Sequence, residues 1–190
     1  MADYDQQRRV PSPTLSARTE RALKRFVLNL AADNVRGIEA LLREDVLNLS
    51  DPGEFAAARK PIIGHEKVTL FIRKVTRLVE TGGVPARMQI TSLNGMPALL
   101  LEVDPPRTDF SPRQAMLLDV GDDGRIERVY VVLGTQKLAG LDFTGLRGMP
   151  PWLERGMRKL RAFIRHLQPA HKRLSKHIQV HAGSRARRVR

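Results

Sequence analysis

Four side chains of this 190-residue chain, Asp51, Asp119, Tyr130 and His65, are of the types that exchange protons in enzymes. A carboxylate working with a hydrogen-bond donor could remove a proton next to a carbonyl group. Each residue also has a structural interpretation: a Pro-Gly turn for Asp51, strand positions for Asp119 and Tyr130, and a lone helix start for His65. We therefore assign no catalytic residue and keep these four as weak candidates.

Other catalytic and metal-binding signatures are missing from the sequence. It has no glycine-rich phosphate loop, no HExxH motif and no nucleophile elbow. It has no cysteine, which excludes disulfides and thiolate metal sites. We predict no cofactor and no metal. Residues 1–20 lack the apolar stretch of a signal peptide, and no apolar run reaches the ~20 residues of a membrane span, so we expect a cytoplasmic protein.

The end of the chain has the chemistry of phosphate binding. Residues 147–190 carry 13 basic residues and one acid, whereas residues 1–146 carry 20 basic and 19 acidic residues. A dense basic strip displaces counterions from a nucleic-acid backbone without reading its sequence. The predicted nucleic-acid-binding residues are Arg155, Arg158, Lys159, Arg161, Arg165, Lys172, Arg173, Lys176, Arg185, Arg187, Arg188 and Arg190.

Three other interpretations of this basic segment remain open. Leu153, Met157, Leu160, Ile164 and Leu167 form a narrow apolar seam at helical spacing. The seam could dock on the body of the protein and leave the charge as a solvated face. It could also lie on an anionic membrane surface or fit a groove of a partner protein.

The first third of the chain has helical periodicity. Apolar residues recur over 23–31 and 35–42, which predicts a helical hairpin broken at Asp33-Asn34, with Ser16 or Thr19 as the first N-cap. A brief strand is predicted at 46–49, and a third helix over 65–79 that Gly82-Gly83 ends.

After residue 86 the spacing of the apolar residues changes from the helical period of 3.6 residues to the strand period of 2. Strands are predicted at 87–93, 98–103, 114–120 and 126–133, with Asn94-Gly95 and Asp122-Asp123-Gly124 as hairpin turns. Helices followed by strands indicate an α+β domain with helices on one face of a curved sheet. We predict a flexible arm over 1–17, this domain over 18–140, a Gly/Pro hinge over 141–151, basic amphipathic helices over 152–180 and a disordered tail over 181–190.

Three stretches resemble one protein family: 57–64, 93–100 and 130–138. They resemble the SnoaL-like domain, of the nuclear-transport-factor-2-like superfamily, at the C-terminus of a group of extracytoplasmic-function RNA polymerase sigma factors. The resemblance implies a cone-shaped fold with a curved antiparallel sheet on three N-terminal helices. The residues that carry it are Asp51, Gly53, Arg59, Lys60, Pro61, Gly64, Asn94, Gly95, Lys137 and Leu138.

The family's two working motifs are only partly present in this sequence. Ser50-Asp51-Pro52-Gly53-Glu54 stands where the family has a glycine-rich acidic turn. Gly134-Thr135-Gln136-Lys137-Leu138 keeps the Lys-Leu of an Asn-Pro-Asp-Lys-Leu-like segment. Fifteen polar residues before the first helix leave no room for the sigma DNA-binding domains. We therefore expect either a separated regulatory domain or a relative that has lost the connection to the sigma factors.

The resemblance implies a non-catalytic regulatory module of transcription. Its partners would be RNA polymerase or sigma-factor domains, with nucleic acid bound by the tail; a small apolar ligand and a homodimer stay open. The alternatives are a small-ligand carrier and an enzyme. Steroid isomerases and polyketide cyclases of this superfamily hold a carboxylate base in the cone, for which Asp51, Glu54 and Asp119 are the available acids. Those isomerases also place a tyrosine on the first helix, where this chain has none.

Overall fold

The computed structural model describes residues 10–81, 87–105 and 107–146, together with residues 148, 150, 151 and 153–155. The predictions for the arm before residue 10, for the helix stop at Gly82-Gly83 and for the basic segment after residue 155 therefore lie outside the described residues. So do the basic residues of the proposed nucleic-acid site, apart from Arg155.

The helices of the N-terminal half form where they were predicted, but the second one ends at Glu39 and not at residue 42, because Leu42 already begins a strand. The helices are α2 (Pro13–Ala31), α3 (Val35–Glu39), α4 (His65–Thr81) and, near the end of the domain, α5 (Thr135–Leu138). The N-cap of α2 is Ser12, which accepts from the Leu15 N–H at 3.2 Å, and neither Ser16 nor Thr19 caps it. We predicted a flexible arm up to residue 17, but α2 already begins at Pro13. Proline is tolerated in the first helical turn, where its missing N–H has no helical partner.

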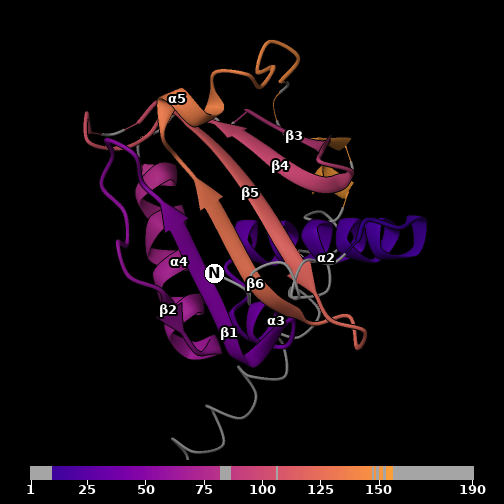
Figure 1. Cartoon of the computed structure of the whole chain (residues 1–190). Coiled ribbons are helices and arrows are strands. Elements are labelled where there is room, and N and C mark those ends of the chain that lie inside the picture. Colours follow the sequence, from indigo (N-terminus) through magenta and orange to yellow (C-terminus); the bar gives the residue numbers. More distant parts are fainter. Residues whose placement is uncertain are drawn as a thin grey trace, which may run out of the picture.

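Six strands form one sheet, in the order β2-β1-β6-β5-β4-β3. The four strands predicted after residue 86 are confirmed, and β1 is longer than predicted. The strands are β1 (Leu42–Asp51), β2 (Ile62–Ile63), β3 (Arg87–Leu93), β4 (Met96–Glu102), β5 (Arg113–Val120) and β6 (Ile126–Val132). Neighbouring strands pair antiparallel, with one exception. The first strand, β1, pairs in parallel with the last strand, β6 (Figure 1).

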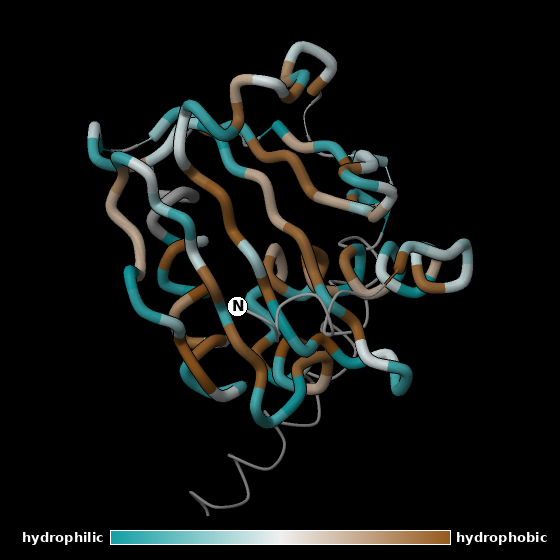
Figure 2. Tube along the Cα trace, in the orientation of Figure 1, coloured by the Kyte–Doolittle hydropathy of each residue, from teal (hydrophilic) through white to brown (hydrophobic). Residues whose placement is uncertain are grey.

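The β3–β4 turn is built as the sequence predicts. Asn94 and Gly95 both have positive φ, at 52° and 77°, as a type I′ hairpin turn requires. The strands contain many hydrophobic residues, whereas the β5–β6 turn at Asp122-Asp123 is hydrophilic (Figure 2). Turn chemistry therefore fixed both hairpins and the register of the strands they join.

The helices cover one face of the sheet, which we call the inner face (Figure 1). Side chains alternate between faces along each strand, so the inner face receives every second residue. The inner cluster packs α2, α3 and α4 onto the strands. Its fully buried members include Leu23, Phe26, Ile38, Leu42, Val46, Val68, Val120, Ile126 and Val129.

The opposite, outer face is partly covered by residues 138–146, which we call the strap. Leu138, Phe143 and Leu146 are buried in an outer cluster with Leu100 and Ala115 of the sheet. Leu153, seven residues further on, is fully buried in the inner cluster. Leu146 and Leu153 therefore belong to clusters on opposite faces of the sheet.

The architecture is an α+β cone, with a curved and unclosed sheet packed on helices, which confirms the predicted fold class. In the described residues, none of the helices combines the length and the hydropathy that crossing a membrane requires.

Candidate functional site

The two segments that resemble the family motifs meet at one edge of the sheet. Strands β1 and β6 are parallel neighbours, so their C-terminal ends emerge side by side. Asp51, the last residue of β1, stands opposite Val132, the last residue of β6. The Leu133 N–H donates to the Asp51 carbonyl oxygen at 2.9 Å and continues the ladder. We call Asp51, Gly53, Glu54, Gly134, Thr135 and Lys137 the motif corner.

Two carboxylates join the halves of the motif corner. The Lys137 ammonium pairs with Asp51 Oδ2. The Glu54 carboxylate accepts from the Thr135 N–H, at 3.3 Å to Oε1 and 3.4 Å to Oε2. Thr135 begins α5, whose N-cap residue Gly134 has no capping side chain, so Glu54 supplies the acceptor from another loop. The hydrogen bonding with Thr135 lowers the pKa of Glu54.

The backbone of the motif corner is packed too closely for side chains. Gly53 has φ +55°, and a Cβ there would lie 2.5 Å from the Gly134 Cα atom. A Cβ on Gly134 would lie 3.3 Å from the Gly53 Cα atom. Glycine at both positions therefore lets the two loops touch through their backbones.

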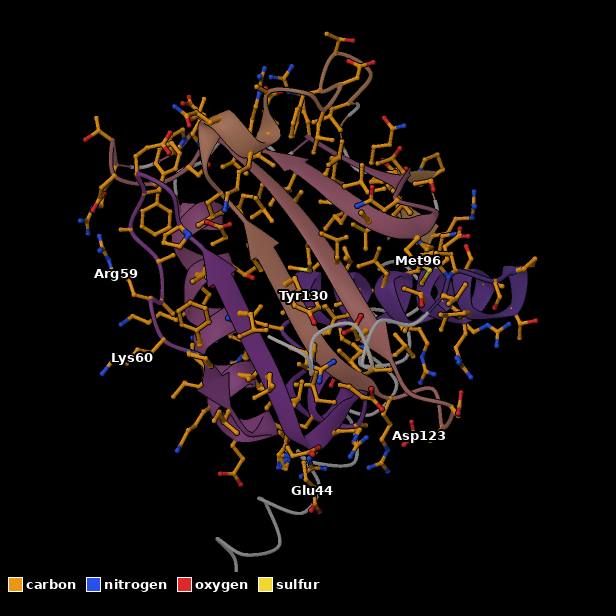
Figure 3. The ribbon with its side chains drawn as sticks, in the orientation of Figure 1. Glu44, Arg59, Lys60, Met96, Asp123 and Tyr130 are labelled. Carbon is orange, nitrogen blue, oxygen red and sulfur yellow. The ribbon has the colours of Figure 1, made fainter. Side chains whose placement is uncertain are left out.

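Neighbouring loops hold the motif corner in place. The Ala56 N–H donates to the Asp109 carbonyl oxygen at 2.8 Å, and the buried Ser111 hydroxyl donates to the Leu133 carbonyl oxygen at 3.0 Å. Arg59 and Lys60 follow on the same loop, are exposed and point away from the body (Figure 3). Neither makes an ion pair within the described part of the chain. They are available to an acidic partner.

Asp119 and Tyr130 also come together, but on the outer face of the sheet. The Tyr130 hydroxyl donates to Asp119 Oδ2 at 2.9 Å, and Arg128 Nη1 lies 3.3 Å from the same oxygen. Tyr130 stands opposite Leu117 in the β5–β6 ladder, whereas the inner cluster takes Leu118 and Val129. The pair therefore lies on the outer face and not in the cone between the sheet and the helices.

The electrostatics of this pair favour a structural role. Partial burial, followed by the negative charge of Asp119, raises the pKa of Tyr130 to about 12. Tyr130 therefore stays protonated at neutral pH and keeps donating to Asp119, whose oxygen is also satisfied by Arg128. A base needs a free acceptor atom facing the substrate, whereas Asp119 Oδ2 already accepts from Tyr130 and pairs with Arg128.

The other weak candidates do not join the Asp119–Tyr130 pair. Asp51 pairs with Lys137, and His65 begins α4 after Gly64, whose N–H donates to the Val46 carbonyl oxygen at 2.9 Å. In the described residues no group of three or more His, Cys, Asp or Glu side chains could hold a metal ion. The four candidates therefore do not form one catalytic site.

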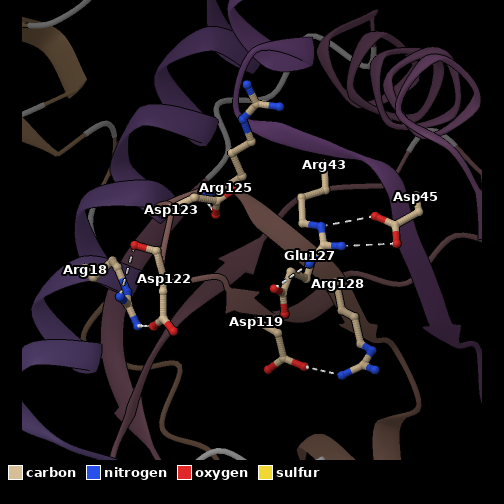
Figure 4. Close-up of polar contacts among 9 residues, drawn as sticks. All are labelled: Arg18, Arg43, Asp45, Asp119, Asp122, Asp123, Arg125, Glu127 and Arg128. Atoms are coloured by element: carbon tan, nitrogen blue, oxygen red, sulfur yellow. Dashed lines mark hydrogen bonds and ion pairs between the residues drawn. The ribbon is translucent and has the colours of Figure 1, made fainter.

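Ion pairs at the β5–β6 hairpin are ties between elements (Figure 4). Arg18 of α2 lies 2.9 Å from Asp122 in the turn, and Arg43 of β1 lies 2.9 Å from Glu127 of β6. Arg43 also pairs with Asp45 at 3.1 Å. These contacts tie α2 and β1 to the hairpin, and no local pattern of residues predicted them.

Three buried polar side chains, Thr19, Asn48 and Thr69, have hydrogen-bonding atoms without a partner among the described residues. Asn48 is 0% exposed and Thr69 is 2% exposed, and Asn48 Oδ1 and Thr69 Oγ1 find no partner among the described residues. Asn48 lies two residues after Val46 on β1, and Thr69 five residues after Gly64 on α4. The Gly64 N–H donates to the Val46 carbonyl oxygen, so the chain enters α4 beside the strand that carries Asn48.

The other residues that carry the family resemblance have structural roles at turns, at a helix start and in the outer cluster. Pro61 and Gly64 shape the entry to α4, where Gly64 has φ +97°. Asn94 and Gly95 form the β3–β4 turn, and Leu138 is buried in the outer cluster. Sequence reasoning placed Asp51, Gly53 and Lys137 in the motifs, but missed the capping role of Glu54, which needs the two loops to be adjacent.

Comparisons with known proteins identify the fold. No family model and no curated sequence match this chain. Among solved structures, the extracytoplasmic function sigma factor SigJ of Mycobacterium tuberculosis matches with a TM-score of 0.54 and 22% identity. The match covers 64% of this chain and 44% of SigJ, so the chain corresponds to less than half of that protein.

Two further neighbours have the same kind of fold. A steroid delta-isomerase from Pseudomonas aeruginosa matches with 19% identity and a TM-score of 0.47, covering 80% of this chain and 98% of that one. RV0760c of Mycobacterium tuberculosis, in complex with estradiol-17beta-hemisuccinate, matches with 16% identity and a TM-score of 0.44, covering 60% and 92%. The chain has a nuclear-transport-factor-2-like, SnoaL-like fold, and at these identities the likeness extends to the fold alone.

Proposed function

We propose that this protein is a non-catalytic regulatory module of transcription that binds a protein partner through the motif corner. The observation that carries the proposal is the meeting of the two motif-like segments. Asp51 pairs with Lys137, Glu54 caps α5, and Gly53 touches Gly134. Residues separated by about eighty positions thus form one surface, built on loops that a rigid sheet positions.

The character of the motif corner suits recognition of a protein surface. The side chains of Asp51 and Lys137 are 40% and 63% exposed, so a partner can reach both charges. Arg59 and Lys60 add two positive charges without partners on the adjoining loop. Charges arranged in this way set the orientation and specificity of docking more than its strength. The partner that fits is RNA polymerase or a sigma-factor domain that presents acidic side chains.

The basic segment would add a second contact. Arg155, exposed at the end of the described residues, is the first of twelve basic residues proposed to bind nucleic acid or the polymerase. Such binding releases counterions, so its affinity should fall steeply with salt. The cytoplasm, where polymerase works, is the compartment that this role requires.

The test is an affinity pull-down from nuclease-treated bacterial lysate with the full-length protein. We expect RNA polymerase or sigma subunits to be recovered with the wild type and with Tyr130→Phe. Lys137→Met and the swap Asp51→Lys with Lys137→Asp should both lose them, because the swap restores the ion pair but reverses the charges that a partner meets. Recovery with every variant, or with none, would reject the motif corner as the docking site.

A second candidate, binding of a small ligand in the cone, is favoured by the unpartnered atoms of Asn48 and Thr69. A buried polar atom without a hydrogen bond costs about 1–3 kcal/mol, so a hydroxyl group of a guest could satisfy both. Thr69→Val tests it in a thermal melt. If a hydroxylated guest binds at this site, Thr69→Val should be less stable than wild type. If no guest binds there, Thr69→Val should be as stable as wild type or more stable, because the substitution removes an unpartnered buried hydroxyl.

A further inference from the structure

The charges of the body are divided between its two layers. The helices, residues 13–39 and 65–81, carry nine basic and five acidic residues. The strands and their loops, residues 42–63 and 87–146, carry nine basic and twelve acidic residues. Because the helices cover the inner face of the sheet, their exposed sides form a positive surface of the molecule (Figure 1). The near-neutral balance of residues 1–146 conceals this division.

A row of positive side chains runs along α4. The side of this helix that faces the core carries Val68 and Ile72, which are 0% and 6% exposed. Lys67 and Lys74 are exposed on the other side. They are seven residues, or about two helical turns, apart and therefore share one face of the helix. Leu70 lies between them and is the only large apolar side chain that the described parts of α2, α3 and α4 expose.

Two arginines of α4 extend this row toward the turn between α2 and α3. Arg73 and Arg77 each pair with Asp33 in that turn, at 2.6 Å. Two guanidinium groups share one carboxylate, so the three residues together keep a net positive charge. The same ion pairs hold the turn against α4, which brings the basic residues beside the turn close to the row.

Arg25 of α2 and Arg36 of α3 are exposed beside that turn. The Asn29 amide donates to the Arg25 carbonyl oxygen at 2.8 Å, and the Asn29 side-chain oxygen accepts from the Asn34 amide at 2.7 Å. Asn34 in turn accepts from the N–H of Gly37, the residue after Arg36, at 3.2 Å. These hydrogen bonds place two more cations at the helix junction. We call the following residues the basic helical face: Arg25, Arg36, Lys67, Arg73, Lys74 and Arg77.

We propose that the basic helical face binds the phosphate backbone of a nucleic acid, as a site of the body that is separate from the basic segment. Four of its six residues are arginines, whose planar guanidinium groups match phosphate oxygens in geometry. A protein partner would find a single apolar anchor here, whereas surfaces that bind nucleic acid are polar and strongly positive. Contacts with phosphates position the nucleic acid and carry no sequence preference.

The test measures the affinity of full-length protein for a DNA duplex of random sequence at about 0.1 M salt. One variant, Lys67→Glu with Lys74→Glu, reverses two charges on α4. A second variant, Arg25→Glu with Arg36→Glu, reverses two charges at the helix junction. The basic segment is the same in every variant, so its own binding to DNA cancels in the comparison.

The matched control is Arg87→Glu with Arg107→Glu. It makes the same change of net charge at two residues of the sheet side whose side chains are 58% and 67% exposed. Each reversal on the basic helical face should weaken binding at least tenfold, whereas the control should weaken it less than twofold. The slope of log affinity against log salt should become shallower by about 2 in each face variant, because each phosphate contact contributes about 0.9.

Two results of this experiment would overturn the proposal. An equal loss in the control would mean that net charge alone determines the affinity. Unchanged binding in both face variants would leave the basic segment as the whole nucleic-acid site. Neither result bears on the motif corner, which is tested with polymerase and with other variants.

Two further measurements complete the test. NMR spectra of the unsubstituted protein avoid any effect of the substitutions on folding. The duplex should shift the amide signals of Arg36 and Lys74 and leave that of Thr91 on β3 unchanged; shifts confined to the basic segment would overturn the proposal. Poly-glutamate is the second probe. If it binds as tightly as the duplex and loses affinity in the same two variants, the face is a site for acidic protein segments and the proposal fails.

Discussion

The motif corner and the Asp119–Tyr130 pair each place a carboxylate beside a polar partner, but they are built differently. Asp119 and Tyr130 stand on adjacent antiparallel strands, where regular cross-strand spacing makes them neighbours and Arg128 completes the arrangement. The motif corner joins loops that follow two parallel strands distant in sequence. On the regular strands, Asp119 and Tyr130 therefore use their hydrogen-bonding atoms on each other and on Arg128. In the loops of the motif corner, the charged side chains stay accessible to a partner.

The largest effect is expected where the motif corner depends on backbone contact. Gly53→Ala places a Cβ 2.5 Å from the Gly134 Cα atom at a residue with φ +55°. Strain and overpacking together should lower the free energy of unfolding by about 2–4 kcal/mol. Urea denaturation measures the loss. Gly140→Ala is the matched control, since its Cβ would meet nothing within 4 Å; equal stability of both variants would contradict the close approach.

Tyr130→Phe should have an intermediate effect on stability. The substitution removes one hydrogen bond to a charged acceptor, which contributes about 1–2 kcal/mol when the pair is partly buried. Binding of the proposed partner should not change. A denaturation curve equal to that of wild type would mean that the outer-face pair is not a stabilising contact.

The same pair makes a prediction at high pH. The pKa of Tyr130 in the folded protein is about 12, above the ordinary value of 10, so its neutral form stabilises the fold. This contribution is complete below pH 10 and is lost as the pH rises from 10 to 12. The stability difference between wild type and Tyr130→Phe should shrink across that range. Absorbance titration of a Tyr4→Phe variant, which leaves one tyrosine, should give a midpoint near 12.

Glu54 makes the opposite prediction at low pH. Hydrogen bonding with Thr135 lowers the pKa of Glu54 below its ordinary value of 4.5. The stability that the charged carboxylate contributes is therefore complete above about pH 4.5 and is lost as the pH falls through the lower folded-state pKa. Glu54→Gln should be less stable than wild type at pH 7 and should approach it in acid. A constant difference from pH 7 to pH 3 would contradict the capping role.

The ion pair of the motif corner should contribute least to stability. Both partners are substantially exposed, and such pairs typically contribute about 0.5 kcal/mol or less. Asp51→Asn and Lys137→Met should therefore unfold within that margin of wild type in urea. A larger loss would make the pair a structural tie and weaken its assignment as a docking site.

Local patterns in the sequence predicted most of the fold. Periodicity located α2, α4 and the four strands after residue 86, and Asn94-Gly95 specified its turn because few other pairs adopt two positive φ values. The parallel pairing of β1 with β6 could not be predicted, since nothing local encodes which distant strands become neighbours.

The candidate site was predicted less completely for the same reason. Asp51, Gly53 and Lys137 could be singled out as motif residues, but their contact depends on the β1–β6 pairing. The sequence also predicted a Gly/Pro hinge over 141–151, whereas Phe143 and Leu146 are buried against Leu100 and Ala115 on the outer face of the sheet. Glycine and proline mark irregular backbone, and isolated apolar residues between them were not recognised as anchors.

The central claim is that the motif corner, and not the outer-face pair, is the functional surface. The most direct measurement is the affinity of purified bacterial RNA polymerase for immobilised full-length protein, compared among wild type, Lys137→Met and Tyr130→Phe. We predict that wild type and Tyr130→Phe bind equally and that Lys137→Met binds at least tenfold more weakly. Equal binding by all three, or a loss confined to Tyr130→Phe, would contradict the claim.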